Sequence, residues 1–240
     1  MPAYNEEGNI EDALRAVTGI LEEALSDYEI IVVDDGSQDR TALLAQRLAV
    51  GNPKIKVTSN GENKGYGYTF KRGLHLARKS YVTIFPGDND MSADILKNLI
   101  REIDQREELI LTYPSCVHNR SLFRRLVSKS FVVFMNGVFG LRLKYYNGAF
   151  ICETKRVQSL PLKSGGLTVL AECIVRLIQS GCRYKSIPFV HTGRKSHQSK
   201  AFTFKNIRAV TKFIFILIGD IYFAGNTSKR ALSFRKKWPL

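Results

Sequence analysis

Two carboxylates, Asp88 and Asp90, stand one residue apart directly after the apolar stretch Tyr81–Phe85 and the dipeptide Pro86-Gly87. A buried strand that ends in a tight turn would present both acids at its mouth. Such a pair can hold one hard divalent cation, because Mg²⁺ takes one or two protein carboxylates and completes its shell with phosphate oxygens and water. We therefore interpret Asp88 and Asp90 as candidate ligands of Mg²⁺ or Mn²⁺, which would neutralise charge on a leaving diphosphate.

Two further polar motifs follow predicted strands. Asp34-Asp35-Gly36-Ser37 comes directly after the β-branched run Ile30–Val33, and Asn63-Lys64-Gly65 follows the strand candidate Lys54–Thr58. A continuous β-branched run is typical of a strand that is buried on both faces of a parallel sheet. Ligands of open α/β sheets bind beyond the carboxyl ends of the strands. The three motifs together therefore predict one ligand site, although each alone is also typical of a solvated turn.

Strands and helices are predicted to alternate along the first half of the chain. Apolar residues at helical spacing favour helices, and short apolar runs favour strands. This alternation favours an α/β domain with a mostly parallel sheet flanked by helices. The expected helices are Asn9–Ser26, Thr41–Val50, Tyr68–Arg78 and Ala93–Gln105, and the expected strands are Ile30–Val33, Lys54–Thr58, Tyr81–Phe85 and Leu109–Tyr113.

The alternation is expected to stop after Asn119, where basic and amphipathic segments begin. In this second half we expect a helix at Leu167–Ser180 and a short strand at Tyr184–Pro188. The change of pattern near residue 120 indicates a change of role along the chain.

Two apolar stretches in the second half, Phe131–Leu141 and Phe213–Ala224, are flanked by Lys and Arg. Both are shorter than the ~20 residues that span a bilayer, and Asp220 inside the second stretch argues against a span. Each is interpreted either as a core helix or as an amphipathic helix that lies in a membrane interface.

The net charge is +14, with 36 Lys and Arg against 22 Asp and Glu. The first 50 residues are net acidic, so the excess belongs largely to the segments after Asn119. A basic surface favours an anionic partner, which can be a phosphorylated substrate, a lipid headgroup or a nucleic acid. Arg194 and Lys200 are candidate phosphate-binding cations. No nucleic-acid-binding motif is recognised, so binding of nucleic acid is kept only as an alternative.

Four cysteines stand far apart, and no Cys-x-x-Cys pair indicates zinc or a disulfide framework. The polar N-terminal stretch MPAYNEEGN has no signal-peptide character. We therefore expect reduced thiols and a cytoplasmic location.

Five motifs in this order resemble the family 2 glycosyltransferases of the GT-A fold, and among them the polyprenyl-phosphate sugar transferases of the dolichyl-phosphate mannose synthase type. The resemblance extends from about Pro2 to Lys200 and implies a Rossmann-like, mostly parallel sheet followed by C-terminal amphipathic helices. The motifs are PAYNEE (Pro2–Glu7), EIIVVDDGSQDRT (Glu29–Thr41), NKGYG (Asn63–Gly67), the pair Asp88 and Asp90 as the counterpart of a DxD motif, and Arg-x-x-x-x-Ser-Lys (Arg194–Lys200).

The resemblance implies roles for individual residues on the donor side. Asp35 would read the nucleobase or ribose, Lys64 would continue the nucleotide pocket, and Asp88 and Asp90 would bind the metal and the diphosphate. The first nucleotide-contacting loop would comprise Pro2, Tyr4, Asn5 and Glu6.

On the acceptor side, the resemblance implies that Glu172 serves as a general base or acceptor-site residue. Arg194, Ser199 and Lys200 would bind phosphates near the acceptor. A structural alternative for Glu172 is a polar position on a helix whose other residues are apolar.

The implied domain organisation has three parts. Residues 1–120 would form the half that binds the nucleotide sugar, and residues 121–205 would form the acceptor-binding half of the same GT-A domain. Residues 206–240 would form a basic and apolar tail that associates with a membrane.

The implied activity is inverting transfer of a sugar from a UDP- or GDP-sugar to an acceptor. The favoured acceptor is a polyprenyl phosphate, dolichyl or undecaprenyl, reached by peripheral association with the cytoplasmic face of a membrane. The first alternative is transfer to a hydroxyl group of a glycan or a small molecule. The others are an N-terminally truncated, non-catalytic product and a basic nucleic-acid-binding module.

One departure from the family concerns the first strand. In the family a hydrophobic strand precedes the Pro-x-Tyr-Asn-Glu motif, and this sequence shows no such strand ahead of Pro2. That strand would lie in the interior of the sheet. We therefore expect exposed strand edges, exposed apolar surface and low stability, unless another segment fills the gap.

Overall fold

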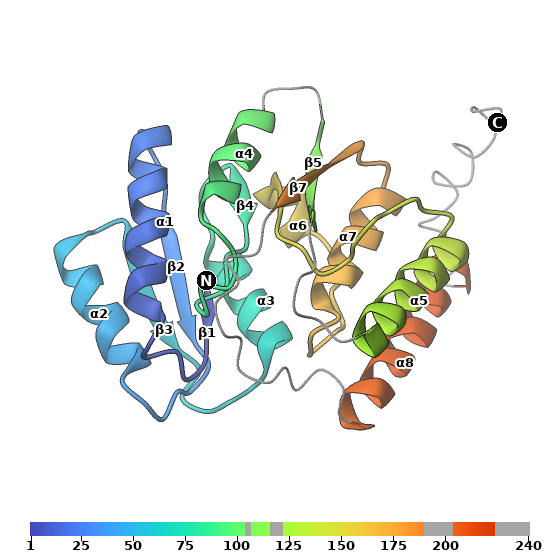
Figure 1. The fold of residues 1–240 in the computed structure, drawn as a ribbon, viewed down its shortest axis with the longest axis horizontal. Coiled ribbons are helices and arrows are strands. Elements are labelled where there is room, and N and C mark those ends of the chain that lie inside the picture. Colours follow the sequence, from blue (N-terminus) through green and yellow to red (C-terminus); the bar gives the residue numbers. More distant parts are fainter. Residues whose placement is uncertain (104–106, 116–121, 190–203, 224–240) are drawn as a thin grey trace.

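The computed structural model describes residues 1–103, 107–115, 122–189 and 204–223. The architecture is α/β, with two small sheets in the middle and helices around them (Figure 1). The first sheet and helices α1 and α2 lie at one end of the molecule, and helices α5 and α8 lie at the other (Figure 1).

The first sheet has the order β1-β2-β3, and its strands are parallel. The second has the order β4-β6-β5-β7, in which β5 and β7 are parallel and β6 runs antiparallel to β4 and β5. The strands are β1 Pro2–Ala3, β2 Ile30–Asp34, β3 Ile55–Ser59, β4 Tyr81–Thr83, β5 Leu109–Pro114, β6 Phe150–Glu153 and β7 Tyr184–Phe189.

The helices of the described part follow the strands closely along the chain. They are α1 Ile10–Ala24, α2 Thr41–Gly51, α3 Tyr66–Leu76, α4 Asp94–Glu102, α5 Leu122–Phe139, α6 Thr154–Gln158, α7 Val169–Gln179, α8 Phe204–Ile218 and the π-helical turn η2 Gly219–Phe223.

The predicted α/β class is confirmed, and every expected helix and strand is present with bounds shifted by a few residues. The β-branched run Ile30–Val33 forms β2, in which Val32 and Val33 are buried. Helix α1 buries Ile10 and Leu14 one turn apart, as its helical spacing predicts. These elements place the predicted motifs at the carboxyl ends of the strands.

The first strand of the structure is only two residues long, and its residues Pro2–Ala3 pair with Val33–Asp34. One expectation about strands was wrong. The alternation does not stop after Asn119, because β6 and β7 alternate there with α6 and α7. Strand β6 has no period-2 pattern, since Phe150, Ile151 and Cys152 are all buried between β4 and β5.

Strand β5 lies before residue 120 in the sequence, and it pairs with β6 and β7, which lie after it. The second sheet therefore draws on both predicted halves of the domain. The division at residue 120 stays a prediction about roles.

None of the helices in the described part of the chain is long and apolar enough to cross a bilayer. Helix α5 instead packs beside η2, where the rings of Phe139 and Tyr222 stack with their centroids 6.4 Å apart. The Tyr222 hydroxyl also donates to the carbonyl of Val138 at 2.6 Å. The two predicted amphipathic segments are thus neighbours in space.

Candidate functional site

The segment after β1 docks on the turn after β2. Asn5 has a left-handed backbone (φ 55°), and its N–H donates to the Ser37 hydroxyl at 2.9 Å. The side-chain oxygen of Asn5 accepts from the backbone of Gln38 at 2.9 Å. The Glu6 N–H donates to the Thr41 hydroxyl at 2.7 Å. The first two predicted motifs therefore form one surface.

Asp35 is buried and joins the turn after β2 to the glycine-containing loop before α3. Its carboxylate accepts the backbone N–H groups of Lys64 and Gly65, both at 2.9 Å, and the side-chain amide of Asn60 at 2.7 Å. Gly36, with φ 71°, is needed beside it because a Cβ there would lie 2.5 Å from the backbone of Glu62. The Asp35 carboxylate thus sets the position of the loop.

The acid pair lies beside β1. Gly87 donates its N–H to the carbonyl of Pro2 at 3.0 Å, which fixes the turn that leads into the acids. The N–H of Asp90 donates to Oδ1 of Asp88 at 3.1 Å, and Asn89 between them has φ 54°. Asp88 is exposed at the mouth of the turn.

Tyr66, the first residue of α3, connects this turn to the glycine-containing loop. Burial raises the pKa of the Tyr66 hydroxyl above its usual range, and the nearby negative charge of Asp88 raises this pKa further. Because the charge of Asp88 acts on the proton of Tyr66, the start of α3 and the acid pair share one electrostatic environment.

The four predicted segments therefore form a closed ring of contacts. Hydrogen bonds join the segment after β1 to the turn after β2, that turn to the loop before α3, and the turn of the acid pair to Pro2. Between the start of α3 and the acid pair, the link is the electrostatic effect of Asp88 on Tyr66. The predicted gathering of these motifs at one site is found in the structure. The roles of the individual residues in ligand binding stay predictions.

Two predicted donor-side residues stand at the rim of this ring. Tyr4 is exposed. The ammonium group of Lys64 lies over the ring of Tyr68, 5.2 Å from its centroid, and 3.8 Å from the Glu62 carboxylate. Both side chains can reach a ligand without breaking a buried contact.

The acid pair fits a metal that arrives with a phosphate ligand better than a metal held by protein alone. Within the described residues, no group of three or more His, Cys, Asp and Glu side chains converges. Two carboxylates one residue apart, with Asp88 exposed, match the one or two protein ligands that Mg²⁺ takes when phosphate and water complete its shell.

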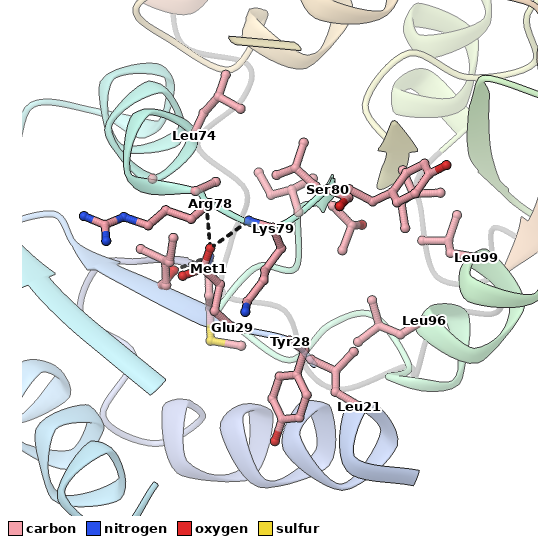
Figure 2. A pocket seen from close by; sticks show the side chains of 18 of the residues that line it. Met1, Leu21, Tyr28, Glu29, Leu74, Arg78, Lys79, Ser80, Leu96 and Leu99 are labelled. Atoms are coloured by element: carbon pink, nitrogen blue, oxygen red, sulfur yellow. Dashed lines mark hydrogen bonds between the residues drawn. The ribbon is translucent and has the colours of Figure 1, made fainter. Parts of the chain in front are cut away.

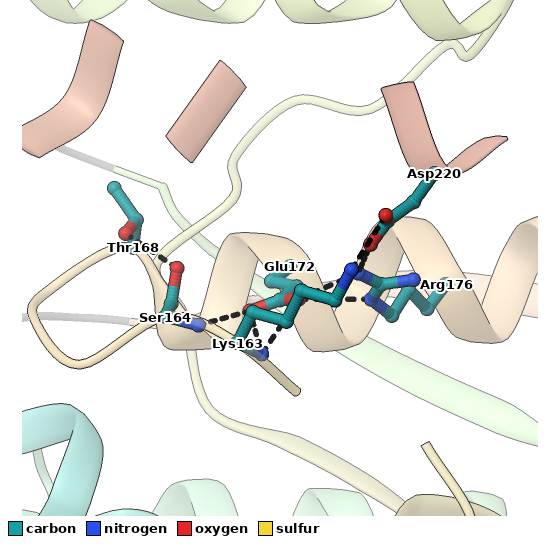
Figure 3. Close-up of polar contacts among 6 residues, drawn as sticks. All are labelled: Lys163, Ser164, Thr168, Glu172, Arg176 and Asp220. Atoms are coloured by element: carbon teal, nitrogen blue, oxygen red, sulfur yellow. Dashed lines mark hydrogen bonds and ion pairs between the residues drawn. The ribbon is translucent and has the colours of Figure 1, made fainter. Parts of the chain in front are cut away.

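Glu172 on α7 is 1% exposed, and its carboxylate is surrounded by hydrogen-bond donors (Figure 3). It accepts the backbone N–H groups of Lys163 (3.0 Å) and Ser164 (2.7 Å) and the Nε–H of Arg176 (2.9 Å). Arg176 and the Lys163 ammonium both pair with Asp220 of η2 at 2.6 Å. These contacts give Glu172 a positioning role, and its role as a base stays a prediction.

The segment that Glu172 holds packs against the ring of motifs. A Cβ on Gly67 would lie 2.5 Å from the carbonyl carbon of Gly165, so the start of α3 and the segment at Lys163–Gly166 touch backbone to backbone. Glu172 therefore acts on the site through this segment. The sequence offered one signal for the network, since Glu172 and Arg176 have the i,i+4 spacing of helical ion pairs.

The predicted acceptor-side residues Arg194, Ser199 and Lys200 lie outside the described residues. Their phosphate-binding role stays a prediction.

The fold and the ring of motifs define an α/β protein with a polar site at the carboxyl ends of its strands. The family model described as glycosyl transferase family 2 matches residues 1–160, and this chain belongs to that family. The predicted GT-A fold is confirmed by solved glycosyltransferase structures. Glucosyl-3-phosphoglycerate synthase from Mycobacterium tuberculosis in complex with UDP has a TM-score of 0.68 and 18% identity, over 91% of this chain and 77% of that one.

Two curated relatives align with more of this chain than the family model does. A dolichol-phosphate mannosyltransferase from Pyrococcus furiosus is 26% identical over 209 residues, which cover 83% of this chain and 57% of the relative. An undecaprenyl-phosphate 4-deoxy-4-formamido-L-arabinose transferase from Pseudomonas fluorescens is 25% identical over 214 residues, which cover 83% and 58%. The chain spans about half the length of the curated relatives it matches.

Replacing Asp88 or Asp90 with Asn should weaken Mn²⁺-dependent binding of a nucleoside diphosphate by about tenfold or more, which is about 1.4 kcal/mol. The physical reason is the loss of one anionic ligand, while the turn keeps its shape. Binding is measured from the electron paramagnetic resonance signal of free Mn²⁺ with UDP or GDP present. Asp27→Asn, an exposed carboxylate beyond the opposite ends of the strands, is the matched control. Unchanged binding in both acid-pair variants would remove these residues from the metal site.

Glu172→Ala should lower the free energy of unfolding by about 3 kcal/mol, because two backbone N–H groups lose their acceptor and Arg176 loses one of its two carboxylate partners. Urea denaturation measures the change. Asp220→Ala, at the more exposed rim of the same network, should cost less. A Glu172→Ala variant that is as stable as the parent but lacks turnover would contradict the positioning role and favour the role of a base.

Proposed function

We propose that this protein transfers a sugar, with inversion, from a nucleoside-diphosphate sugar to a polyprenyl phosphate at a membrane surface. The observation that carries the proposal is the closed ring of four segments, from Pro2 to Asp90, at the carboxyl ends of the strands. An acid pair and a lysine gather there, and a diphosphate that arrives with a divalent metal requires both kinds of group.

A UDP-sugar or a GDP-sugar is proposed as the donor. Solved relatives in complex with UDP and Mn²⁺ support a nucleoside diphosphate and a divalent metal. Asp88 and Asp90 would hold this ion, which supplies charge neutralisation for the leaving nucleoside diphosphate. Lys64 would add a second positive charge from the loop that Asp35 positions.

A polyprenyl phosphate is proposed as the acceptor. The printed names of two relatives, one for dolichol phosphate and one for undecaprenyl phosphate, support it. An acceptor phosphate is already anionic at neutral pH, so its oxygen can attack the anomeric carbon with little help from a base. This chemistry agrees with a Glu172 that is fully hydrogen-bonded and serves to position the segment Lys163–Gly166.

A phosphorylated small molecule is the second candidate acceptor. A structural neighbour was solved in complex with phosphoglyceric acid, with a TM-score of 0.68. Transfer to a hydroxyl group of such a molecule would need a general base, and Glu172 would then be the candidate.

Sugar transfer to lipid should be detected when the purified chain is incubated with radiolabelled UDP- or GDP-sugars, Mn²⁺ and a polyprenyl phosphate. Label should move into the organic phase in the parent chain and not in Asp88→Asn, because that variant loses a metal ligand. Parallel reactions contain 3-phosphoglycerate in place of the lipid. Transfer to the water-soluble acceptor with none to the lipid would contradict the proposed acceptor.

Peripheral association with the cytoplasmic face of a membrane is proposed for the end of the molecule that carries α5 and η2. Leu126, Val133 and Phe134 are exposed on α5 next to exposed Arg125 and Lys129. Phe215 on α8 and Phe223 on η2 are 71% and 80% exposed, which is unusual for side chains of this size. Apolar side chains beside cations are suited to the interface of an anionic bilayer.

The double variant Phe215→Ala and Phe223→Ala should bind vesicles of phosphatidylcholine and phosphatidylglycerol about tenfold more weakly, because two large apolar side chains no longer enter the interface. Vesicle co-sedimentation measures the binding. Val50→Ala on α2 is the matched control, since Val50 is 91% exposed and lies at the other end of the molecule. Equal binding by the double variant and the control would contradict the docking surface.

A further inference from the structure

Two buried cysteines are brought together by the second sheet. Leu109 of β5 pairs with Cys152 of β6 on one side and with Tyr184 of β7 on the other, and Cys182 precedes Tyr184 by two residues. The N–H of Cys182 donates to the carbonyl of Leu177 at 3.1 Å, which holds this cysteine against the end of α7. Both cysteines are free thiols.

The side chain of Cys152 points toward the helices α3 and α7. Successive residues of a strand point to opposite faces of the sheet, and Ile151 lines the cavity between the two sheets (Figure 2). Phe150 and Cys152 therefore point the other way, where the ring of Phe150 meets that of Phe70 on α3 with the centroids 6.5 Å apart. Helix α3 contacts α7, and Cys173 of α7 is near enough to Cys152 for the two thiols to interact electrostatically.

The sulfur of Cys182 accepts hydrogen bonds from three side chains. The Nη1–H of Arg156 donates to it at 3.4 Å, the Ser180 hydroxyl lies at 3.9 Å, and the thiol of Cys152 is the third donor. The hydrogen bonds from Cys152, Arg156 and Ser180 hold the pKa of the Cys182 thiol below its usual range, although burial opposes them. The hydrogen bond to Cys182 and burial in turn raise the pKa of Cys152. The pair therefore consists of a thiolate at Cys182 and a protonated thiol at Cys152.

The charged groups around Cys182 favour its thiolate. Arg156 pairs with Glu108 at 2.5 Å and with Glu153 at 3.1 Å, so two carboxylates fix the guanidinium that contacts the sulfur. Burial raises the pKa of Cys173, the nearby thiol on α7, which therefore stays protonated. A thiolate is the nucleophilic form of cysteine, and a neighbouring arginine is one of the features that mark a reactive one.

The sulfur of Cys182 lies one side chain beneath the surface. Cys182 is 4% exposed, but its chain neighbours Gly181 and Arg183 are exposed, and the Arg156 side chain that contacts it is 43% exposed. Cys152 is 1% exposed and lies deeper. A small uncharged oxidant such as hydrogen peroxide therefore reaches Cys182 first.

We propose that Cys182 and Cys152 form a reversible dithiol–disulfide pair that hydroperoxides oxidise, with Cys182 as the thiol that reacts first. The Cys182 thiolate attacks one oxygen of hydrogen peroxide, the O–O bond breaks, and a sulfenic acid and hydroxide form. The Cys152 sulfur then attacks the Cys182 sulfur, the S–O bond breaks, and the oxygen leaves as water with the proton of Cys152. In total, two thiols are oxidised to one disulfide and one hydrogen peroxide is reduced to two waters.

The disulfide joins the second sheet to the end of α7. Helix α7 carries Glu172, which positions the segment Lys163–Gly166, so oxidation ties this anchor covalently to β6. A thiol reductant reverses the bond by thiol–disulfide exchange. The pair does not depend on the proposed sugar transfer, and it is tested without a sugar substrate.

Peptide mapping of the full chain after treatment with hydrogen peroxide tests the pair directly. Trypsin places the three cysteines of the described part in different peptides, Tyr145–Lys155, Ser164–Arg176 and Leu177–Arg183. Mass spectrometry without reductant should find the first and third peptides joined, and dithiothreitol should separate them. A chain in which Cys182 stays reduced, or in which Cys116 or Cys173 takes the place of Cys152, would overturn the proposal.

Three variants assign the order of the two steps. In Cys152→Ser the reaction should stop at the sulfenic acid of Cys182, which dimedone traps. In Cys182→Ser the thiol of Cys152 should stay reduced, because it is deeper and protonated. Cys173→Ser, which removes another buried thiol, is the matched control and should form the same disulfide as the parent chain. Oxidation of Cys152 in Cys182→Ser at the rate seen in the parent would overturn the assignment of Cys182 as the first thiol to react.

The part played by Arg156 is tested by Arg156→Gln. This variant should slow the reaction of Cys182 with hydrogen peroxide at pH 7 by about tenfold, and it should move the pH profile of Cys182 alkylation by iodoacetamide to higher pH, because the thiolate loses its cation. Lys155→Gln removes the adjacent exposed cation and is the matched control. Equal pH profiles in the two variants would contradict the role given to Arg156.

Discussion

The carboxylate of Asp35 is the interaction on which the proposed donor site depends most. It is buried, and its oxygens accept hydrogen bonds from the backbone N–H groups of Lys64 and Gly65 and from the side-chain amide of Asn60. Hydrogen bonds from backbone N–H groups fix a loop more firmly than side-chain contacts would, because the loop cannot move without leaving a buried charge unpaired. The start of α3, and with it the surroundings of Asp88, follow from this one carboxylate.

Glu172 anchors a second segment in the same way, on the other side of the site. It too is a buried carboxylate that accepts two consecutive backbone N–H groups, those of Lys163 and Ser164. The two anchored segments meet where Gly67 and Gly165 touch, at a contact that admits no side chain. Through Arg176 and Asp220 the second anchor extends to η2, so polar contacts join the proposed membrane-facing end to the segment that packs against the proposed donor site.

The gathering of the motifs could be predicted from the sequence because it follows a local rule. Polar motifs that follow apolar strands meet at one edge of a parallel sheet. That rule gathered Asp35, Lys64 and Asp88 correctly. It could not find β6, whose antiparallel insertion depends on neighbours far away in the chain. It also could not show that Glu172 is enclosed by donors, because these lie on a segment with no regular pattern. The two-residue β1 was too short to give a periodic signal.

The ring of four segments is proposed to bind a nucleoside diphosphate through a divalent metal. Calorimetric titration of the purified chain with UDP and with GDP, each with and without Mn²⁺, tests this binding. One of the two nucleotides should bind, with an affinity that depends on Mn²⁺. A chain that is folded by circular dichroism and binds neither nucleotide in the presence of Mn²⁺ would contradict it.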